Sequence, residues 1–256
     1  MPRRPLLSVL AALVVIAGLP CALAQKYSTA DQVMDAVDAR PVPADVVSAM
    51  TMTITAKSGQ SLTRSMDIWS AGDGDRQVIK FTAPADIKGS GFLSITMPDG
   101  ATQSMIYLPA LDRTRRIAGS QKQEAFFGSD FSYEDISDLQ SGTRKDYVSE
   151  LLKVEPGPVY VVQSTPKAGA DTSYDKLVLE IPEATLLPRR VEFYRNGALL
   201  KVMTIAETAE VGGYVLPSEL RMETLARGSS TTIRQSDFAV DKAIPDAVFT
   251  ERFLRR

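Results

Sequence analysis

Histidine is absent from this sequence of 256 residues, and cysteine occurs once, as Cys21. The first absence excludes a Ser-His-Asp triad, histidine-ligated zinc or iron, and a histidine general base. The second leaves no cysteine pair for a disulfide and no cysteine cluster for a metal site. G-x-S-x-G, P-loop and G-x-G-x-x-G motifs are also missing. We therefore expect a protein that is not an enzyme and that needs neither a cofactor nor a metal.

Long apolar runs are missing except near the N-terminus. Residues 6–19 are apolar, but a membrane-spanning helix needs about 20 such residues. Arg3 and Arg4 precede this stretch, and the small-x-small sequence Ala22-Leu23-Ala24 follows it. This order is typical of a secretory signal peptide. We predict a signal over residues 1–24 that is cleaved before Gln25, and a mature protein in the periplasm.

Cys21 lies inside this signal, where it raises the question of a lipid anchor. A bacterial lipoprotein signal places Gly, Ala or Ser directly before the modified cysteine, whereas Pro20 stands there in this sequence. We therefore expect ordinary cleavage and no lipid on Cys21.

An excess of basic residues is also missing. The chain has 29 Lys plus Arg and 31 Asp plus Glu, for a net charge of −2. The signal contains two of the basic residues and none of the acidic ones, which leaves −4 from Gln25 onward. This mild acidity argues against a nucleic-acid-binding protein, which normally carries a basic surface.

What the sequence does contain is a short helix followed by many strands. Thr29 precedes apolar residues at helical spacing and predicts a helix that ends near Arg40. From residue 46 onward the pattern alternates between apolar and polar residues in short runs, with Asn196-Gly197 as the clearest hairpin turn. This spacing predicts one mainly β domain over residues 25–256, built as an antiparallel barrel or a strongly curved sheet.

One connection is far longer than a hairpin turn. Residues 119–142 lie between two predicted strands, where about 2–5 residues are usual. Ser132 or Asp130 is a candidate N-cap for a short helix within this insertion. The connection also concentrates four aromatic residues, which form either a lid over an apolar cavity or a clamp that fixes the loop to the sheet: Phe126, Phe127, Phe131 and Tyr133.

Two further sets of residues are candidates for binding. If one alternating face of the early strands lines a cavity, its apolar residues are Met50, Met52, Ile54, Met66, Ile68, Phe81, Leu93 and Ile95. Methionine adapts to varied apolar guests, but it also fills ordinary cores, so both interpretations stay open. The second set, a basic cluster, is either a contact for a head group or partner or a solvated strand end: Arg113, Arg115 and Arg116.

The run MIYLPALDRTRRIAGSQKQEAFFGSDFSYEDI resembles the signature of the outer-membrane lipoprotein-sorting protein family, relatives of the lipoprotein carrier LolA. KFTAPADIKGSGFL before it and LPRRVEFYRNGALLK and IPDAVFTERFLRR after it fall in the expected order. The resemblance implies an incomplete, strongly curved antiparallel β-barrel with a helical lid and an apolar cavity. It also implies a role in lipid transport and outer-membrane biogenesis, with an inner-membrane efflux-type permease as a partner.

Three hypotheses follow for the function. The first is a monomeric periplasmic carrier for lipids or lipoprotein acyl chains, which needs apolar area rather than catalytic groups. The second is a sensor or adaptor of the same fold, acting with a membrane permease or regulatory partner. The third is a hydrolase, which would need a buried carboxylate pair or a Ser-Lys pair in a cleft.

Overall fold

The computed structural model describes residues 25–72, 74–98, 100–139 and 146–256. The predicted signal peptide and Cys21 lie outside these residues. Within the described ranges, no helix is long and apolar enough to cross a membrane.

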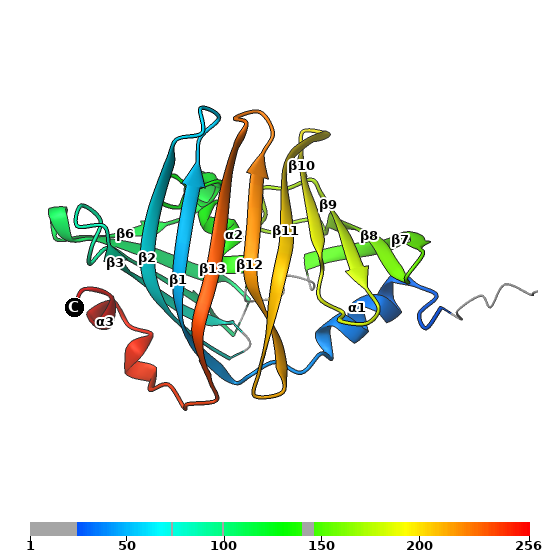
Figure 1. The fold of residues 1–256 in the computed structure, drawn as a ribbon, viewed down its shortest axis with the longest axis horizontal. Helices are drawn as coiled ribbons and strands as arrows, with labels where there is room; N and C mark the ends of the chain where they lie inside the picture. The colour runs from blue at the N-terminus through cyan, green and yellow to red at the C-terminus, as the bar shows by residue number, and fades with distance from the viewer. Residues whose placement is uncertain (1–24, 73, 99, 140–145) are drawn as a thin grey trace, which may run out of the picture.

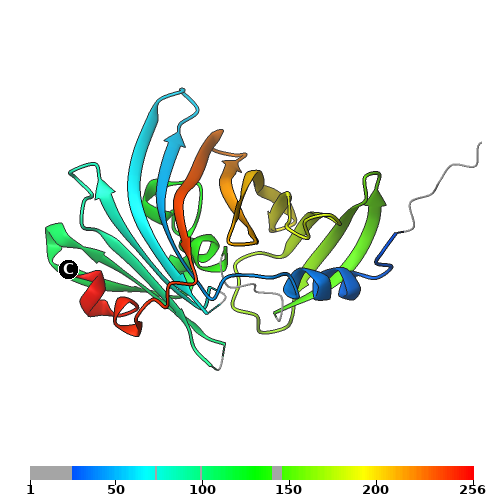
Figure 2. The same ribbon diagram turned by 60° about the horizontal axis from the view of Figure 1, so that its bottom comes forward.

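A single sheet contains all thirteen strands of the described part of the chain, in the order β6-β5-β4-β3-β2-β1-β13-β12-β11-β10-β9-β8-β7. The strands are β1 (Asp45–Thr55), β2 (Ser61–Ala71), β3 (Arg76–Ala83), β4 (Gly91–Thr96), β5 (Thr102–Leu108), β6 (Arg113–Ile117), β7 (Tyr147–Glu155), β8 (Val159–Pro166), β9 (Lys176–Pro182), β10 (Arg190–Arg195), β11 (Ala198–Val211), β12 (Tyr214–Thr224) and β13 (Ser229–Val240). Every neighbouring pair is antiparallel. The sheet curves strongly without closing, which confirms the predicted fold class (Figures 1 and 2).

The two open edges of the sheet, β6 and β7, are consecutive in the chain. This explains the long connection between them, because it joins opposite ends of the sheet rather than two paired strands. It carries η2 (Gly119–Gln123), η3 (Phe126–Gly128) and α2 (Tyr133–Asp138). Figure 2 shows these elements inside the curve of the sheet. We call residues 119–139 the plug.

Strand register defines the concave face, because directly paired residues point to the same side. One row of paired residues crosses eight strands: Val162, Leu179, Val191, Met203, Met222, Thr231, Ile54 and Leu62. Most of these residues belong to or pack against the main hydrophobic cluster, which also contains the plug residues Phe126, Phe131 and Tyr133. The core of the protein therefore lies between the concave face and the plug.

The predicted N-terminal helix is present as α1 (Ala30–Asp38). The Thr29 side chain caps it by accepting a hydrogen bond from the Gln32 backbone N–H at 3.2 Å. Its buried residues Val33 and Met34 pack on Tyr160 of β8 and neighbouring residues. Since Val162 lies in the concave row, α1 covers the β7–β9 end of the same face.

A second packed layer lies on the convex side of β2–β5. There Trp69, Val78 and Tyr107 pack with Phe249 and Leu254, which belong to the C-terminal segment. This segment contains η5 (Asp246–Val248) and α3 (Glu251–Leu254), and Thr250 caps α3. Strands β2–β5 are thus covered on both faces.

The expectation that Leu93 and Ile95 share the face of Met66 is wrong. Leu93 pairs with Val78 and lies in the convex cluster, and Ile95 packs against the same cluster. On β4 the concave side instead carries Phe92 and Ser94, and Ser94 contacts Ser137 of the plug. Because α3 buries the convex side of β4, both faces of this strand are apolar, and alternation alone cannot tell them apart.

The hairpin turn at Asn196-Gly197 is confirmed. Both residues have positive φ values, 53° and 73°, as a two-residue turn between twisted strands requires.

Candidate functional site

The plug fills the concave side of the sheet with aromatic rings. Phe126 and Phe131 are 0% exposed, and Phe127 is partly buried. The ring centroids of Phe126 and Phe92 lie 5.5 Å apart, and those of Phe127 and Phe81 lie 4.5 Å apart. The four aromatic residues singled out in the sequence therefore lie together against the inner strands.

Methionine is concentrated in the face that these rings cover. Met50, Met52, Met66, Met203 and Met222 are all buried in the main cluster. Ile68 and Phe81 lie in the same cluster, and Ile54 packs at its edge. Six of the eight proposed lining residues are thus on the concave face, whereas Leu93 and Ile95 are on the other side. Whether any of them contacts a ligand stays a prediction.

The plug is also anchored by polar groups, beginning with Asp130. Its carboxylate accepts hydrogen bonds from the Ser229 hydroxyl at 2.5 Å and the Thr231 hydroxyl at 2.8 Å. The backbone N–H of Asp130 donates in turn to Thr231 Oγ1 at 2.9 Å. Since both hydroxyls belong to β13, this buried acid fixes the plug to the middle of the sheet.

Glu134 and Asp135 form two further anchors at the start of α2. Glu134 accepts hydrogen bonds from the Thr172 hydroxyl at 2.6 Å and the Ser173 backbone N–H at 2.9 Å. Asp135 forms the capping box with Ser132, which confirms Ser132 as the N-cap. It also accepts from the Tyr174 hydroxyl at 2.6 Å.

Lys201 completes the group around Asp135. Its ammonium donates to Asp135 Oδ2, and the two side chains are only 6% and 2% exposed. Lys201 pairs with Phe193, which places it on the concave face of β11. A buried ion pair of this kind is stabilised only where other hydrogen bonds satisfy both partners. Together, Asp130, Glu134 and Asp135 attach the plug to β13, to the segment before β9 and to β11.

Two arginines hold the tip of the plug. Arg64, on the concave face of β2, donates from Nη1 to the carbonyl oxygen of Phe127. Arg227, in the turn after β12, donates from Nη1 to the carbonyl oxygen of Ser129 at 3.4 Å. Phe127 itself is held with φ 46° and ψ 40°, a left-handed conformation that is strained for a bulky residue. The tip is therefore the strained part of an otherwise well-anchored segment.

The basic cluster on β6 divides between two faces. Arg115 pairs with Ile106 of the concave cluster and binds Glu124 at 3.3 Å, as a solvated strand end would. Arg113 pairs with Leu108, which also packs against the concave cluster. Arg116 instead pairs with Met105, which packs on the convex side. The three residues do not converge on one point.

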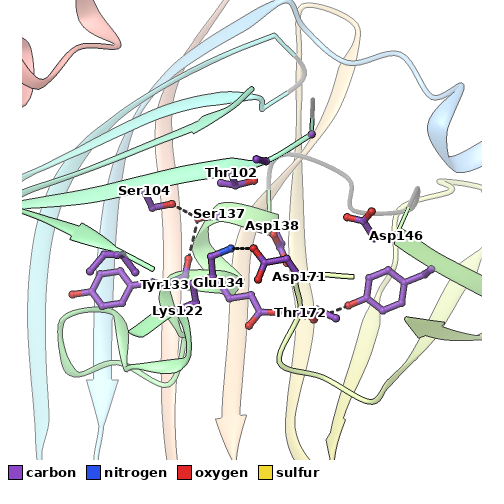
Figure 3. A pocket seen from close by; sticks show the side chains of 14 residues that line it. Thr102, Ser104, Lys122, Tyr133, Glu134, Ser137, Asp138, Asp146, Asp171 and Thr172 are labelled. Carbon is purple, nitrogen blue, oxygen red and sulfur yellow. Dashed lines mark hydrogen bonds and ion pairs between the residues drawn. The ribbon is translucent and has the colours of Figure 1, made fainter. Parts of the chain in front are cut away.

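A pocket of about 160 Å³ lies beside α2, between β5 and the segment that precedes β9 (Figure 3). Its walls include Ser104, Lys122, Ser137, Asp138 and Thr172. An engineered cavity of about 150 Å³ holds one benzene molecule, so a pocket of this size does not hold a whole acyl chain.

Asp138 is the group in this pocket with the most perturbed ionisation. Burial, first, and the neighbouring carboxylates of Glu134 and Asp135 raise its pKa well above the ordinary value. The described residues contain no group of three or more Asp, Glu, His or Cys side chains that could hold a metal ion. Glu134 is occupied by Thr172 and Ser173.

Several residues of this site were not identified from the sequence. Lys201, Tyr174 and Arg227 come from distant strands and turns, so no local pattern connects them with the plug. A signal did exist for Arg64, because it is the one charged residue among the alternating apolar residues of β2. For Asp130 the sequence predicts only a candidate N-cap, a position that Ser132 takes in the structure.

Comparisons with known proteins agree with this architecture. A family model described as an uncharacterized protein matches residues 73–256, well over half of the chain. A DUF1329 family protein from Desulfovibrio piger is 30% identical with a TM-score of 0.81, and the match covers 87% of this chain and 96% of that one. No curated protein matches the sequence.

Two further solved structures are similar to this chain over most of its length. A Vibrio parahaemolyticus domain described as outer membrane lipoprotein-sorting is 30% identical with a TM-score of 0.80, covering 88% of this chain and 97% of that one. A LolA superfamily protein from Nitrosomonas europaea has a TM-score of 0.71 at 21% identity, covering 89% and 100%, and shows the shared fold. The chain therefore belongs to the family of its two 30%-identical neighbours, described as DUF1329 and as outer membrane lipoprotein-sorting, and it has a LolA-like fold.

Proposed function

We propose that this protein is a periplasmic, non-catalytic carrier that binds the acyl chains of lipids or lipoproteins on its concave face. The observation that carries the proposal is the match between a methionine-rich, curved apolar face and a separate aromatic segment that covers it. Burial of apolar surface contributes about 25 cal/mol per Å², so a face of this kind can hold a long chain without charged contacts.

The plug is a second feature that supports a role as a carrier. An empty apolar cavity would expose a patch that promotes association, and the aromatic rings of the plug remove that exposure. Phe127 is the ring whose displacement disturbs the core least, because it is partly exposed and strained. We propose that acyl chains enter by displacing this ring, with Gly128 at φ 80° beside it as a flexible point.

Native mass spectrometry of the mature protein purified from periplasm, followed by lipid extraction, tests the proposal. We expect bound lipid, or uptake of a fluorescent fatty acid after delipidation. Phe127→Ala should speed this uptake, whereas the control Phe253→Ala, on the convex side against Trp69, should not change it. A folded protein that carries no lipid and takes up no fatty acid would contradict the proposal.

One observation favours the sensor or adaptor hypothesis as a second candidate. Edge strand β7 exposes Val148 and Leu152, at 62% and 47%, next to unpaired backbone groups. Such an edge can accept a strand from a partner protein. Partner binding that is unaffected by Phe127→Ala but lost on Val148→Lys would support this function over transport.

A further inference from the structure

Two arginines contact the tip of the plug at one end of the concave face, and Lys57 lies in a neighbouring turn. Arg64 is on β2, Lys57 is in the turn between β1 and β2, and Arg227 is in the turn between β12 and β13. These two turns lie side by side in Figure 1. The side-chain carbons of Lys57 lie within 3.2–3.6 Å of where a Cβ on Gly228 would be, which places Lys57 against the turn of Arg227.

The Arg64 guanidinium contacts the plug through a neutral acceptor rather than a carboxylate. Its Nη1 donates to a neutral carbonyl oxygen, and its buried Nε has no hydrogen-bond partner in the described part of the chain. Burial lowers its pKa, and the charge of Asp86, an exposed residue, opposes this only partly. Partial burial of a guanidinium is unfavourable when no anion offsets it.

Arg227 reaches the same short stretch from the opposite side. Its side chain is 50% exposed and lies 3.9 Å from Asp130 Oδ1. Asp130 is fully buried and already bound by the hydroxyls of Ser229 and Thr231, so its charge is largely satisfied. Both arginines thus contact backbone carbonyls of the plug tip, at Phe127 and Ser129.

The surroundings of these arginines are apolar and partly open. Ile54 and Leu200 pack at the edge of the main cluster, and Leu62 and Leu225 are exposed at the ends of β2 and β12. The Phe127 ring packs on Phe81 at the edge of the methionine-lined cluster, and its carbonyl oxygen is the acceptor of Arg64. A molecule with an anionic head at the arginines would therefore place its apolar part where Phe127 now lies.

We infer that Arg64 and Arg227 bind the phosphate group of a glycerophospholipid whose acyl chains replace Phe127 on the concave face. The inference rests on the proposed function and names the class of cargo. Guanidinium groups pair with phosphate through parallel, charge-assisted hydrogen bonds. In the structure the carbonyl oxygens of Phe127 and Ser129 accept the hydrogen bonds that phosphate oxygens would take, and movement of the tip frees both arginines together.

The test compares phosphatidylglycerol with diacylglycerol of the same acyl chains, on delipidated full-length mature protein. The measured quantity is the ratio of the two dissociation constants, because a looser plug changes both affinities in the same direction. We expect the wild type to favour phosphatidylglycerol by at least about tenfold. Arg64→Gln and Arg227→Gln together should bring the ratio to about one.

Arg221→Gln is the matched control, since Arg221 lies on the convex side of β12 and pairs with Glu223 in solvent. It should leave the ratio unchanged. If Arg64→Gln does not fold, Arg227→Gln alone, in an exposed turn, should still lower the ratio. A ratio of one in the wild type with both lipids bound would overturn the phosphate site and leave the carrier proposal intact.

Two other outcomes are also decisive. Binding of neither lipid would overturn the proposed function itself. Inorganic phosphate, measured by calorimetry, should bind weakly because the tip carbonyls occupy the arginines. The wild type could instead bind phosphate tightly, lose this binding in the double variant, and show equal dissociation constants for the two lipids. That result would overturn the lipid headgroup as the ligand and identify a free anion in its place.

Discussion

At the scale of single residues, Asp135 connects more parts of the molecule than any other member of the plug described here. It caps α2 with Ser132, and it accepts hydrogen bonds from Tyr174 and from Lys201 of β11. Tyr174 keeps its proton, because burial and the Asp135 charge raise its pKa. This arrangement lets a buried carboxylate act as a structural connection between a helix and a distant strand.

Replacement of Lys201 by Met should therefore destabilise the protein strongly. The variant keeps the Asp135 carboxylate buried but removes its cation, which costs about 3–5 kcal/mol when one partner of a buried pair is lost. The exposed pair Arg221–Glu223 provides the control, and Arg221→Gln should change stability by less than about 1 kcal/mol. Urea unfolding measures both values, and equal losses in the two variants would contradict this account.

Asp138 should give stability a specific pH dependence. Its folded-state pKa is raised above 3.8, so the folded protein binds this proton more tightly than the unfolded chain. The resulting stabilisation is fully present below about pH 3.8 and is lost as pH rises through the folded pKa. Asp138→Asn should thus be more stable than the wild type at pH 7, and the difference should shrink on acidification.

The control for this prediction is Asp171→Asn, because the Asp171 side chain is exposed and pairs with Lys122 at the same pocket. It should not increase stability at pH 7. Urea unfolding at several pH values follows both variants. Lower stability of Asp138→Asn than of the wild type at pH 7 would show that the carboxylate of Asp138 is needed.

At the scale of elements, the plug is an anchored segment with one strained tip. Thr231→Val removes two of its hydrogen bonds at Asp130 and leaves a buried carboxylate with one donor fewer. We expect amide exchange in residues 126–136 to rise at least about tenfold, while strands β1–β3 remain protected. Thr63→Val, at an exposed cross-strand contact with Thr53, is the control. Faster exchange across the whole sheet would argue against separate opening of the plug.

The packing of the C-terminal helix α3 on β4 can be tested by a substitution at Gly91. A Cβ on Gly91 would lie 2.6 Å from Leu254 Cδ1 and 3.2 Å from the Ile79 carbonyl oxygen. Gly91→Ala should therefore weaken the docking of α3 and cost about 1–3 kcal/mol. In a double-mutant cycle, Gly91→Ala should cost less when Leu254→Ala is already present. Additive losses would show that α3 is not the neighbour that matters.

The same elements show what local sequence could predict. Alternation placed Met50, Met52 and Met66 on one face, because the residues that alternate with them are polar. It failed for Leu93 and Ile95, because α3 covers the outer side of β4 and makes both faces apolar. The plug aromatics and the Ser132 cap were local signals. The partners Lys201 and Arg227 could not be predicted, because their proximity depends on strand order across the whole sheet.

At the scale of the whole molecule, strand order explains why the plug exists. The chain runs outward from β1 to the edge strand β6, crosses the concave side, and returns from the opposite edge, β7. A crossing segment is therefore required by the topology, and its aromatic residues bury the apolar face that the open sheet leaves uncovered. We propose that acyl chains bind on this face.

A lipid with a photoactivatable diazirine in its acyl chain tests that claim most directly. After binding to delipidated protein and irradiation, peptide mass spectrometry identifies the labelled residues. The account predicts labelling of the concave methionines Met50, Met52, Met66, Met203 and Met222 and of Phe127 in the plug. Labelling confined to the convex cluster around Trp69 and Phe253, or to the exposed edge at Val148 and Leu152, would contradict it.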